Sequence, residues 1–524
     1  MSSASNATDT GLAPLAQRDS AGTAPTRLAL VLAWASATGI ASSILIMIVA
    51  SVVRHSPAVP PVPWRSGLPL LAIAGHLPVA QTYVALWAAV LLGGGGVVAG
   101  LAAVARGARA PARLLITAAL VATAVFAVLP PAGSTDSLSY ATFGRIEVLG
   151  HNPYVMTPNQ LDRTGDPIGR LSILLWRGRG SVYGPLASIE ERAAAELGGT
   201  SATQIVFWLK LWNAIVFAGV VLGLDRLLRS DPARRARAHL LWSVNPLVLW
   251  GIVASGHLQG LATAASFLGL ALLRARRPEG RPAAARPGLL PAVAAGVMVG
   301  VAADFLLYYL LLGLALVWAL RRSRTALLAA VASMGIVVVL PYLSLGSPSL
   351  RAMESRSTKS SADNFYQLFS KSFQHELPAG PRLLVMLACA ALALLLLWRL
   401  PDAVPDLPAI QPALAVGIAW LFLWYYQLPW YTAMIIPLLA LYPGSRLDYV
   451  VMMQLTAGLF AMMPGGNPFQ PPLGWLRAIS HAIWFFWTPV GLLAAVAATV
   501  LLCASGAWNV GSRTRLLPDA PALG

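Results

Sequence analysis

The amino-acid sequence predicts an all-α, polytopic membrane protein with about 12–14 transmembrane helices. Its 524 residues are 57% hydrophobic and only 11% charged, whereas soluble domains carry about 25% charged residues. Apolar stretches recur along the whole chain, and a bilayer core of ~30 Å needs about 20 apolar residues for each helical crossing. Short runs of arginine separate these stretches, which is typical of cytoplasmic loops.

The net charge and the cysteines argue against two other classes of protein. A net charge of +17 would indicate a nucleic-acid partner in a soluble protein. Here, however, the arginines flank apolar stretches, where they set membrane orientation, and we expect no nucleic-acid partner. Cys389 and Cys503 fall inside apolar stretches and have no metal-binding or redox spacing, so they are interpreted as small core residues.

The chain begins with a polar segment that is followed by a retained helix. Residues 1–26 are rich in Ser, Ala, Thr and Gly and are interpreted as a disordered cytoplasmic tail. The apolar stretch 28–53 is too long for the apolar region of a cleaved signal peptide. We therefore expect one transmembrane domain over 27–505 and a second cytoplasmic tail over 506–524.

Windows of about 19 residues predict the position of each span. The stretch 288–320 fits either one long kinked helix or a tight hairpin. The predicted spans are 28–53, 83–105, 113–130, 204–228, 238–255, 258–273, 288–302, 306–320, 325–343, 382–398, 411–425, 430–442, 447–463 and 481–504.

The arginine runs give these spans a direction. If every span is a true crossing, the runs all fall on one side, and the positive-inside rule makes that side the cytoplasm. Both termini are then cytoplasmic. The runs lie at 106–113, 226–237, 274–286, 321–324 and 513–515.

The opposite, extracytoplasmic side receives the long irregular segments 54–82, 131–203, 344–381 and 464–480. Loops of this length in a compact protein are usually functional or disordered. Segment 131–203 is predicted to be the main extracytoplasmic loop and 344–381 the second. The first of these is the candidate active face.

Asp136 is the carboxylate best placed for chemistry. Pro130 and Pro131 end the third span shortly before it, so Asp136 should lie at the membrane boundary, partly withdrawn from water. A carboxylate in that position suits a general base that acts on a sugar hydroxyl. The simpler interpretation is that Asp136 only caps a surface helix, because Asp is a favoured N-cap residue.

Further polar and aromatic residues are predicted on the same face. Arg177 and Arg179 carry the planar donor fork that suits phosphate, although interfacial arginines also contact lipid headgroups. His257 lies at a turn between two spans, where a lone histidine is more often a hydrogen-bonded interfacial residue than a catalyst. Trp430 and Tyr431 fit either an aromatic belt or a platform for sugar rings.

Two other features could belong to the same face. The loop 344–381 is cationic and includes Arg356, which could hold a phosphate or simply be solvated. Asp304 lies in or beside a span, and an acid at that depth is a functional candidate by default.

Short motifs occur in one order along the chain. They are Asp136-Ser-Leu-Ser-Tyr140, Gly144-Arg145, Gly150-His-Asn-Pro-Tyr154, Tyr183-Gly-Pro185, Asn245-Pro-Leu-Val-Leu249 with Gly256-His257, and Leu428-Pro-Trp-Tyr431. Together they resemble the polyprenol-phosphate-sugar-dependent membrane glycosyltransferases of the GT-C type. Within that type they are similar to the actinobacterial α-(1→6)-mannopyranosyltransferase group that extends lipomannan.

The resemblance implies a GT-C-like fold and an inverting sugar transfer, in this group of mannose, from a polyprenyl monophosphate to a glycan or glycolipid acceptor. It implies no cofactor and no more than weak dependence on a divalent metal. Asp136 would be the catalytic base, and cationic side chains would stabilise the departing lipid phosphate. The expected substrate-binding residues are Tyr140, Arg145, Glu147, Asn152, Tyr154, Arg177, Arg179, Tyr183, His257, Arg356, Trp430 and Tyr431.

Two other functions stay open beside this one. A transporter or flippase for a lipid-linked or polar substrate would need discontinuous helices and polar groups near the bilayer midplane, whereas the predicted spans are nearly free of charge. A catalytically silent homologue is the second alternative, because Leu258 and Gln259 stand where the family usually has Asn and an acidic residue. In each case we expect a multi-pass protein of a bacterial cytoplasmic membrane, surrounded by lipid.

Overall fold

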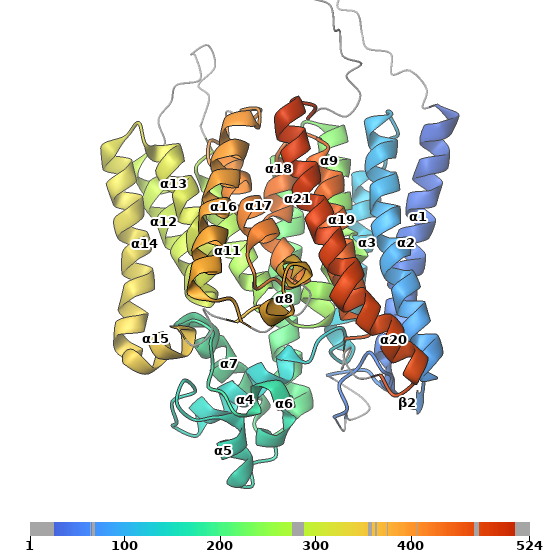
Figure 1. Cartoon of the computed structure of the whole chain (residues 1–524), viewed down its shortest axis with the longest axis vertical. Coiled ribbons are helices and arrows are strands. Elements are labelled where there is room, and N and C mark those ends of the chain that lie inside the picture. Colours follow the sequence, from blue (N-terminus) through green and yellow to red (C-terminus); the bar gives the residue numbers. More distant parts are fainter. Residues whose placement is uncertain are drawn as a thin grey trace, which may run out of the picture.

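The chain folds into a bundle of long helices with a smaller helical layer at one end (Figure 1). The computed structural model describes residues 26–62, 64, 69–274, 288–354, 359–361, 364–374, 376–404, 406–465 and 471–508. Almost all of both predicted tails lies outside these residues, and so does Arg356. The prediction of an all-α membrane protein is confirmed.

Six helices in the described ranges are long and apolar enough to cross a membrane. Most of their residues are apolar, as expected of helices that meet lipid, although one of the six helices carries the buried Lys210 and Asn213. They comprise α1 (Arg27–Val52), α2 (Val79–Ala105), α8 (Ala202–Leu227), α14 (Arg324–Leu345), α16 (Ala379–Arg399) and a continuous segment Gly474–Ser505, formed by α20 (Gly474–Ala482), the π-helix η8 (Ile483–Trp487) and α21 (Thr488–Ser505).

Shorter apolar helices occupy the other predicted spans. They include α3 (Ala112–Val128), α12 (Leu289–Phe305), η4 (Leu307–Leu311) with α13 (Leu312–Leu320), α17 (Ile410–Leu423), η7 (Pro429–Met434) with α18 (Ile436–Leu441), and α19 (Leu447–Met462).

One predicted pair of spans is a strongly bent unit. Its first arm contains α9 (Pro232–Ala238), α10 (Pro246–Val248) and two π-helical segments, η2 (His239–Ser243) and η3 (Leu249–Ala254). Its second arm is α11 (Gln259–Leu272), and the two arms bend by 117° at the break between them. His257 lies in this break.

The layer below the bundle in Figure 1 contains α4 (Asp136–Val148), α5 (Pro158–Arg163), α6 (Leu174–Arg177) and α7 (Pro185–Gly198). The layer therefore comes from the segment 131–203. The remaining short elements are β1 (Val53–His55), which pairs in parallel with β2 (Ile73–His76), η1 (Gly169–Leu171), α15 (Ser347–Glu354), η5 (Phe365–Leu368) and η6 (Lys371–Gln374).

The two ends of the bundle differ as the arginine pattern predicts. In Figure 1, α1 begins and α21 ends at the end opposite to the layer of α4–α7. The loop 106–111, which carries the first arginine run, joins the ends of α2 and α3 at that same end. The layer from 131–203 and this first arginine run therefore lie at opposite ends of the bundle.

The stretch 288–320 is two helices and not one kinked helix. Helix α12 ends beside the start of α7, where the Gly184 N–H donates to the Phe305 carbonyl at 3.2 Å. A Cβ on Gly184 would lie 1.9 Å from the Asp304 carbonyl oxygen, so only glycine permits this approach. The chain then returns through η4 and α13 toward the opposite end (Figure 1).

The position of Asp304 has a structural explanation. Its carboxylate interacts with the backbone N–H of Leu186, in the first turn of α7, although neither oxygen makes a hydrogen bond of standard geometry. The N-terminus of a helix favours negative charge. Asp304 therefore connects the transmembrane bundle to the layer that contains Asp136.

A buried ion pair fixes the opposite end of the bundle. Arg237 donates from Nε to Asp448 Oδ2 at 2.6 Å and from a terminal nitrogen to Oδ1 at 2.5 Å. The same guanidinium also donates to the carbonyls of Leu439 and Tyr442. These carbonyls belong to the last turn of α18 and the residue after it, where a helix leaves carbonyls without partners.

We expect Asp448→Asn to destabilise the protein by about 3–5 kcal/mol, because it leaves Arg237 as an uncompensated buried charge. The double variant Arg237→Met with Asp448→Leu should recover part of this loss, since both charges are removed together. Thermal unfolding in detergent measures both effects. Arg192→Met is the matched control, because Arg192 is exposed and its ion-pair partner is the exposed Glu196. Equal stability of Asp448→Asn and this control would contradict the assignment.

Candidate active site

Asp136 lies at the predicted membrane boundary, shortly after the end of α3. That helix ends at Val128, and α4 begins at Asp136 after a short proline-containing segment. Thr135 is the N-cap, and Asp136 is the first helical residue. The Asp136 N–H donates to Ser134 Oγ at 3.1 Å. The Asp136 carboxylate, with 18% of its side chain exposed, is therefore not the cap of this helix.

The carboxylate of Asp136 faces His257, which comes from the break in the bent unit. Asp136 Oδ2 and His257 Nε2 lie 3.4 Å apart, and the His257 side chain is fully buried. This distance is that of an ion pair, and the contact does not meet the geometry of a hydrogen bond. The structure thus brings together two predicted site residues that are 121 positions apart in the sequence.

The other ring nitrogen of His257, Nδ1, acts as a hydrogen-bond donor. His257 Nδ1 lies 2.6 Å from the Gly251 carbonyl oxygen and 2.9 Å from Ser255 Oγ. A carbonyl can only accept, so Nδ1 must carry a hydrogen. Nε2 then holds either a lone pair or a second proton. Only the doubly protonated ring presents an N–H to the carboxylate, so Asp136 and His257 are placed to share one proton between their facing atoms.

The backbone of η3 supplies the acceptor for His257. Gly251 lies inside this π-helical segment, and π-turns often occur at functional sites. Ser255 Oγ donates to the carbonyls of Trp250 and Gly251, at 3.0 and 2.8 Å. The Gly251 carbonyl of this π-helical turn therefore accepts a hydrogen bond from His257. In a regular α-helix this carbonyl would accept from a backbone N–H of the same helix.

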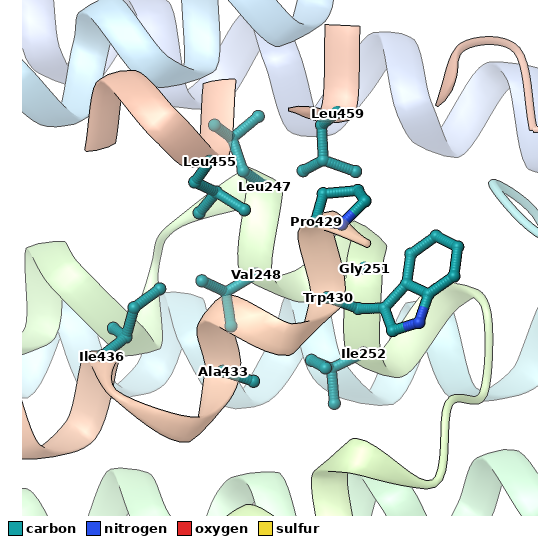
Figure 2. Close-up of a pocket in the computed structure, with 10 residues that line it drawn as sticks. All are labelled: Leu247, Val248, Gly251, Ile252, Pro429, Trp430, Ala433, Ile436, Leu455 and Leu459. Carbon is teal, nitrogen blue, oxygen red and sulfur yellow. The ribbon is translucent and has the colours of Figure 1, made fainter. Parts of the chain in front are cut away.

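The Trp430 ring lies against His257. The two rings stack with centroids 3.9 Å apart and planes inclined by 22°. This stacking holds the plane of the imidazole ring. Figure 2 shows that Trp430 also lines a small pocket with Leu247, Ile252, Pro429 and other apolar residues. Apart from the Trp430 indole N–H, the side chains that line this pocket are apolar.

An aromatic row continues from this point. Tyr308 stacks on Trp420 with centroids 4.5 Å apart, and its ring lies 4.8 Å from that of Tyr431. Trp420 and Tyr431 are separated by 5.8 Å. Tyr431 is a predicted site residue, whereas the contribution of Trp420 from a distant part of α17 could not be read from the sequence.

The predicted tyrosines in the layer of α4–α7 also lie close together. Tyr140 and Tyr183 meet edge to face with centroids 5.1 Å apart. The Tyr154 hydroxyl donates to the Tyr183 carbonyl at 3.0 Å and accepts from Ser188 Oγ at 3.2 Å. Burial, followed by the nearby Tyr183 and Asp136, raises the pKa of Tyr140 well above its usual value. Tyr140 thus remains a neutral hydroxyl next to Asp136.

Glu147 and Asn152 hold the same layer together. Burial raises the pKa of Glu147, against the lowering effects of its hydrogen bond with Ser188 and of nearby Arg192. Asn152 Oδ1 accepts from the Tyr154 N–H at 2.9 Å and so forms the turn after α4. Their assignment to substrate binding stays a prediction.

The predicted arginines each have local partners. Arg145 pairs with Asp166 at 2.8 Å. Arg177 donates to the carbonyls of Ser172 and Arg170, and the guanidinium of Arg179 lies 5.8 Å from the Trp176 ring centroid. These contacts shape the loop between α5 and α7, and the proposed role of these arginines toward phosphate stays a prediction.

Within the described residues, no three His, Cys, Asp or Glu side chains are grouped so that they could hold a metal ion.

Lys210 is a buried polar residue near the site that the motif analysis missed. It lies inside α8 and is fully buried. Its signal in the sequence is a single lysine within an otherwise apolar stretch, which marks a functional candidate in a membrane helix.

Comparisons with known proteins place these residues in a family. The family model described as alpha-(1->6)-mannopyranosyltransferase, N-terminal domain, matches residues 36–340. A probable alpha-(1->6)-mannopyranosyltransferase of Mycolicibacterium smegmatis (strain ATCC 700084 / mc(2)155) is 31% identical over 138 residues, which are 26% of this chain and 24% of that protein. The match thus spans about a quarter of the relative's length. No solved structure matches the chain.

The buried glutamates of α7 make the layer sensitive to pH. Burial raises the pKa of Glu190 to about 8, and no hydrogen bond to its carboxyl oxygens is found among the described residues. The folded protein holds this proton up to about pH 8, whereas an unfolded chain releases it near pH 4.5. The contribution of this group to stability is therefore complete below pH 4.5 and declines as the pH rises toward 8.

Glu190→Gln should flatten this dependence. We expect the variant to be as stable as wild type near pH 4.5 and more stable at pH 8, by on the order of 2–4 kcal/mol. Unfolding in detergent across this pH range measures the difference. Glu196→Gln serves as the control, because Glu196 is exposed on the same helix. Stability curves for wild type and Glu190→Gln that run parallel would refute the buried, protonated carboxyl.

Proposed function

Because the chain belongs to the alpha-(1->6)-mannopyranosyltransferase family, whose model matches more than half of it, we propose that it is an integral-membrane mannosyltransferase with Asp136 as its catalytic base. The family agrees with the resemblance that the sequence motifs predict. The observation that carries the proposal is the Asp136–His257 pair, 3.4 Å apart at the membrane boundary.

The proposed reaction is an inverting displacement at the anomeric carbon of the donor sugar. The acceptor hydroxyl oxygen forms a bond to this carbon while its proton passes to the Asp136 carboxylate. The bond from the anomeric carbon to the phosphate oxygen breaks, and the phosphate leaves with the electron pair. The partial exposure of Asp136 gives the acceptor access, and the buried His257 holds the carboxylate from behind.

The role proposed for His257 follows from its hydrogen bonds. With Nδ1 fixed on the Gly251 carbonyl, the proton on Nε2 faces Asp136 and stabilises its ionised, basic form. The pair thus acts as one acid–base unit, in which the histidine orients the group that reacts.

A lipid-linked donor fits the position of the site. Asp136 lies at the end of a membrane helix, so a sugar on a polyprenyl phosphate would reach it with the lipid chain still in the bilayer. The aromatic row of Tyr308, Trp420 and Tyr431 offers faces for sugar rings beside it. We propose a glycan or glycolipid acceptor, and a mechanism that needs no divalent metal.

The proposed orientation follows the positive-inside rule. The arginine runs face the cytoplasm of a bacterial cell, with both termini on that side, and the layer of α4–α7 lies on the extracytoplasmic face. The nucleotide sugars of the cytoplasm are then out of reach, which agrees with a lipid-linked donor.

A transporter is the second candidate, because the unit bent by 117° resembles the discontinuous helices of transporters. The Asp136 carboxylate, which faces this break, is 18% exposed and belongs to the layer of α4–α7, which suits an accessible catalytic group better than a midplane carrier site. The assays below separate the two functions.

Asp136→Asn should lower kcat about 100-fold or more, because it removes the general base and keeps the size of the side chain. The measurement is mannose transfer from polyprenyl-phosphate mannose in membranes that contain the purified protein. Arg192→Met is the control. Unchanged transfer by the Asn variant would remove Asp136 from the mechanism. If wild type transfers no sugar from any polyprenyl-phosphate donor, the transporter or a catalytically silent homologue becomes the better account.

His257→Phe separates an orienting role from direct substrate binding. Phenylalanine keeps the stacking on Trp430 but removes both ring nitrogens. We expect kcat to fall about 10- to 100-fold while the donor KM changes by less than about threefold. The pH–rate profile should also change on its acidic side. If KM rises and kcat stays constant, His257 is a substrate ligand and not the partner of Asp136.

A further inference from the structure

Lys210 is a buried lysine that contacts the segments leading to both members of the proposed catalytic pair. It lies in α8 and has no exposed surface. No carboxylate lies within ion-pair distance of its ammonium group among the residues that the structure describes. A charged side chain held in this way is costly, so its retention points to a role other than stability.

The ammonium group holds the end of α3. Lys210 Nζ donates to the Leu129 carbonyl and, at 3.3 Å, to the Pro130 carbonyl. These two residues follow the last residue of α3 and begin the short segment that leads to Asp136. Prolines cannot supply backbone N–H groups, and the N–H groups that follow donate to other elements, Ala132 to the Ala254 carbonyl at 3.1 Å and Gly133 to the Ala58 carbonyl at 3.3 Å. Together with these bonds, Lys210 fixes the segment that leads to Asp136.

The aliphatic part of the same side chain supports the turn that carries His257. A Cβ on Gly256 would lie 3.0 Å from Lys210 Cγ and 3.8 Å from the Ser137 Cβ. Gly256 has a φ of +70°, a conformation that glycine adopts without strain. Lys210, Gly256 and Ser137 are therefore packed together, with Ser137 next to Asp136 and Gly256 next to His257 in the chain.

From these contacts we infer that Lys210 is a positioning residue, whose ammonium group and methylene stem set the separation of Asp136 and His257. The inference rests on the proposed function, because a fixed separation matters only if the two residues act together. Displacing a catalytic group by about 1 Å can lower a rate about 100-fold. Lys210 reaches neither residue directly, so it acts through the backbone.

Lys210→Met tests this role. Methionine keeps an apolar stem of similar length and removes the ammonium group, and an apolar replacement of a buried charge often leaves a protein at least as stable. We expect kcat for mannose transfer to fall about 10- to 100-fold, with a donor KM within about threefold of wild type. Lys210→Arg keeps the charge and the donors and should restore part of kcat. Arg192→Met should behave as wild type.

A second readout does not depend on transfer. The ring nitrogens of His257 can be followed by NMR after isotope labelling of the seven histidines, with His257→Phe to assign the signal. In Lys210→Met we expect the chemical shifts of the His257 signals to change, and in Arg192→Met to stay in place. Thermal unfolding shows that the variants are folded.

The outcomes separate the two proposals. If wild type transfers mannose but Lys210→Met keeps its kcat, pH profile and His257 signals, the positioning role is wrong. If wild type transfers no sugar, the proposed function fails, and the His257 signals still decide whether Lys210 holds the pair. A loss of the folded state in Lys210→Met together with full activity in Lys210→Gln would also overturn the inference, since Gln is too short to reach both carbonyls.

Discussion

The hydrogen bond from His257 Nδ1 to the Gly251 carbonyl is the interaction on which the site depends. It fixes which ring nitrogen faces Asp136, and it exists because η3 is wound as a π-helix and the chain bends by 117° directly after it. A regular membrane helix would bury this carbonyl in its own hydrogen bonds. The break between η3 and α11 therefore determines where His257 lies.

The rest of the fold keeps the helix break that carries His257 next to the carboxylate of Asp136. Asp304 meets the first turn of α7, and this contact docks the extramembrane layer against the bundle. At the other end, Arg237 holds the last turn of α18 and thereby the chain that leads back to Trp430. Asp304 and the Arg237–Asp448 pair thus act at element ends, where backbone atoms lack partners, whereas Lys210 lies inside the long helix α8.

Much of the architecture could be predicted from the sequence, because apolar length is a local property. Helices occupy most of the predicted spans, although among the described residues only six, or seven if the bent pair is one span, are long and apolar enough to cross a membrane. The layer comes from the predicted loop 131–203, and the reversal after Asp304 is one of the two arrangements that the hydropathy pattern leaves open. Asp136 was found because two prolines place it at a boundary. Three features depend on packing between segments that are distant in the sequence, which no single-sequence pattern encodes. They are the pairing of Asp136 with His257, the ion pair between Arg145 and Asp166 and the position of Lys210. The assignments of individual residues to substrate binding stay predictions for the same reason.

The central claim is that sugar transfer takes place at the Asp136–His257 pair. A structure of the purified protein with a non-transferable phosphonate analogue of polyprenyl-phosphate mannose tests it most directly. The account predicts that the anomeric carbon lies beside the Asp136 carboxylate, with room for an acceptor hydroxyl within hydrogen-bonding distance of about 3 Å, and that the lipid chain runs into the bilayer. An analogue bound at the Arg237 end of the bundle, or with its sugar remote from Asp136, would contradict it.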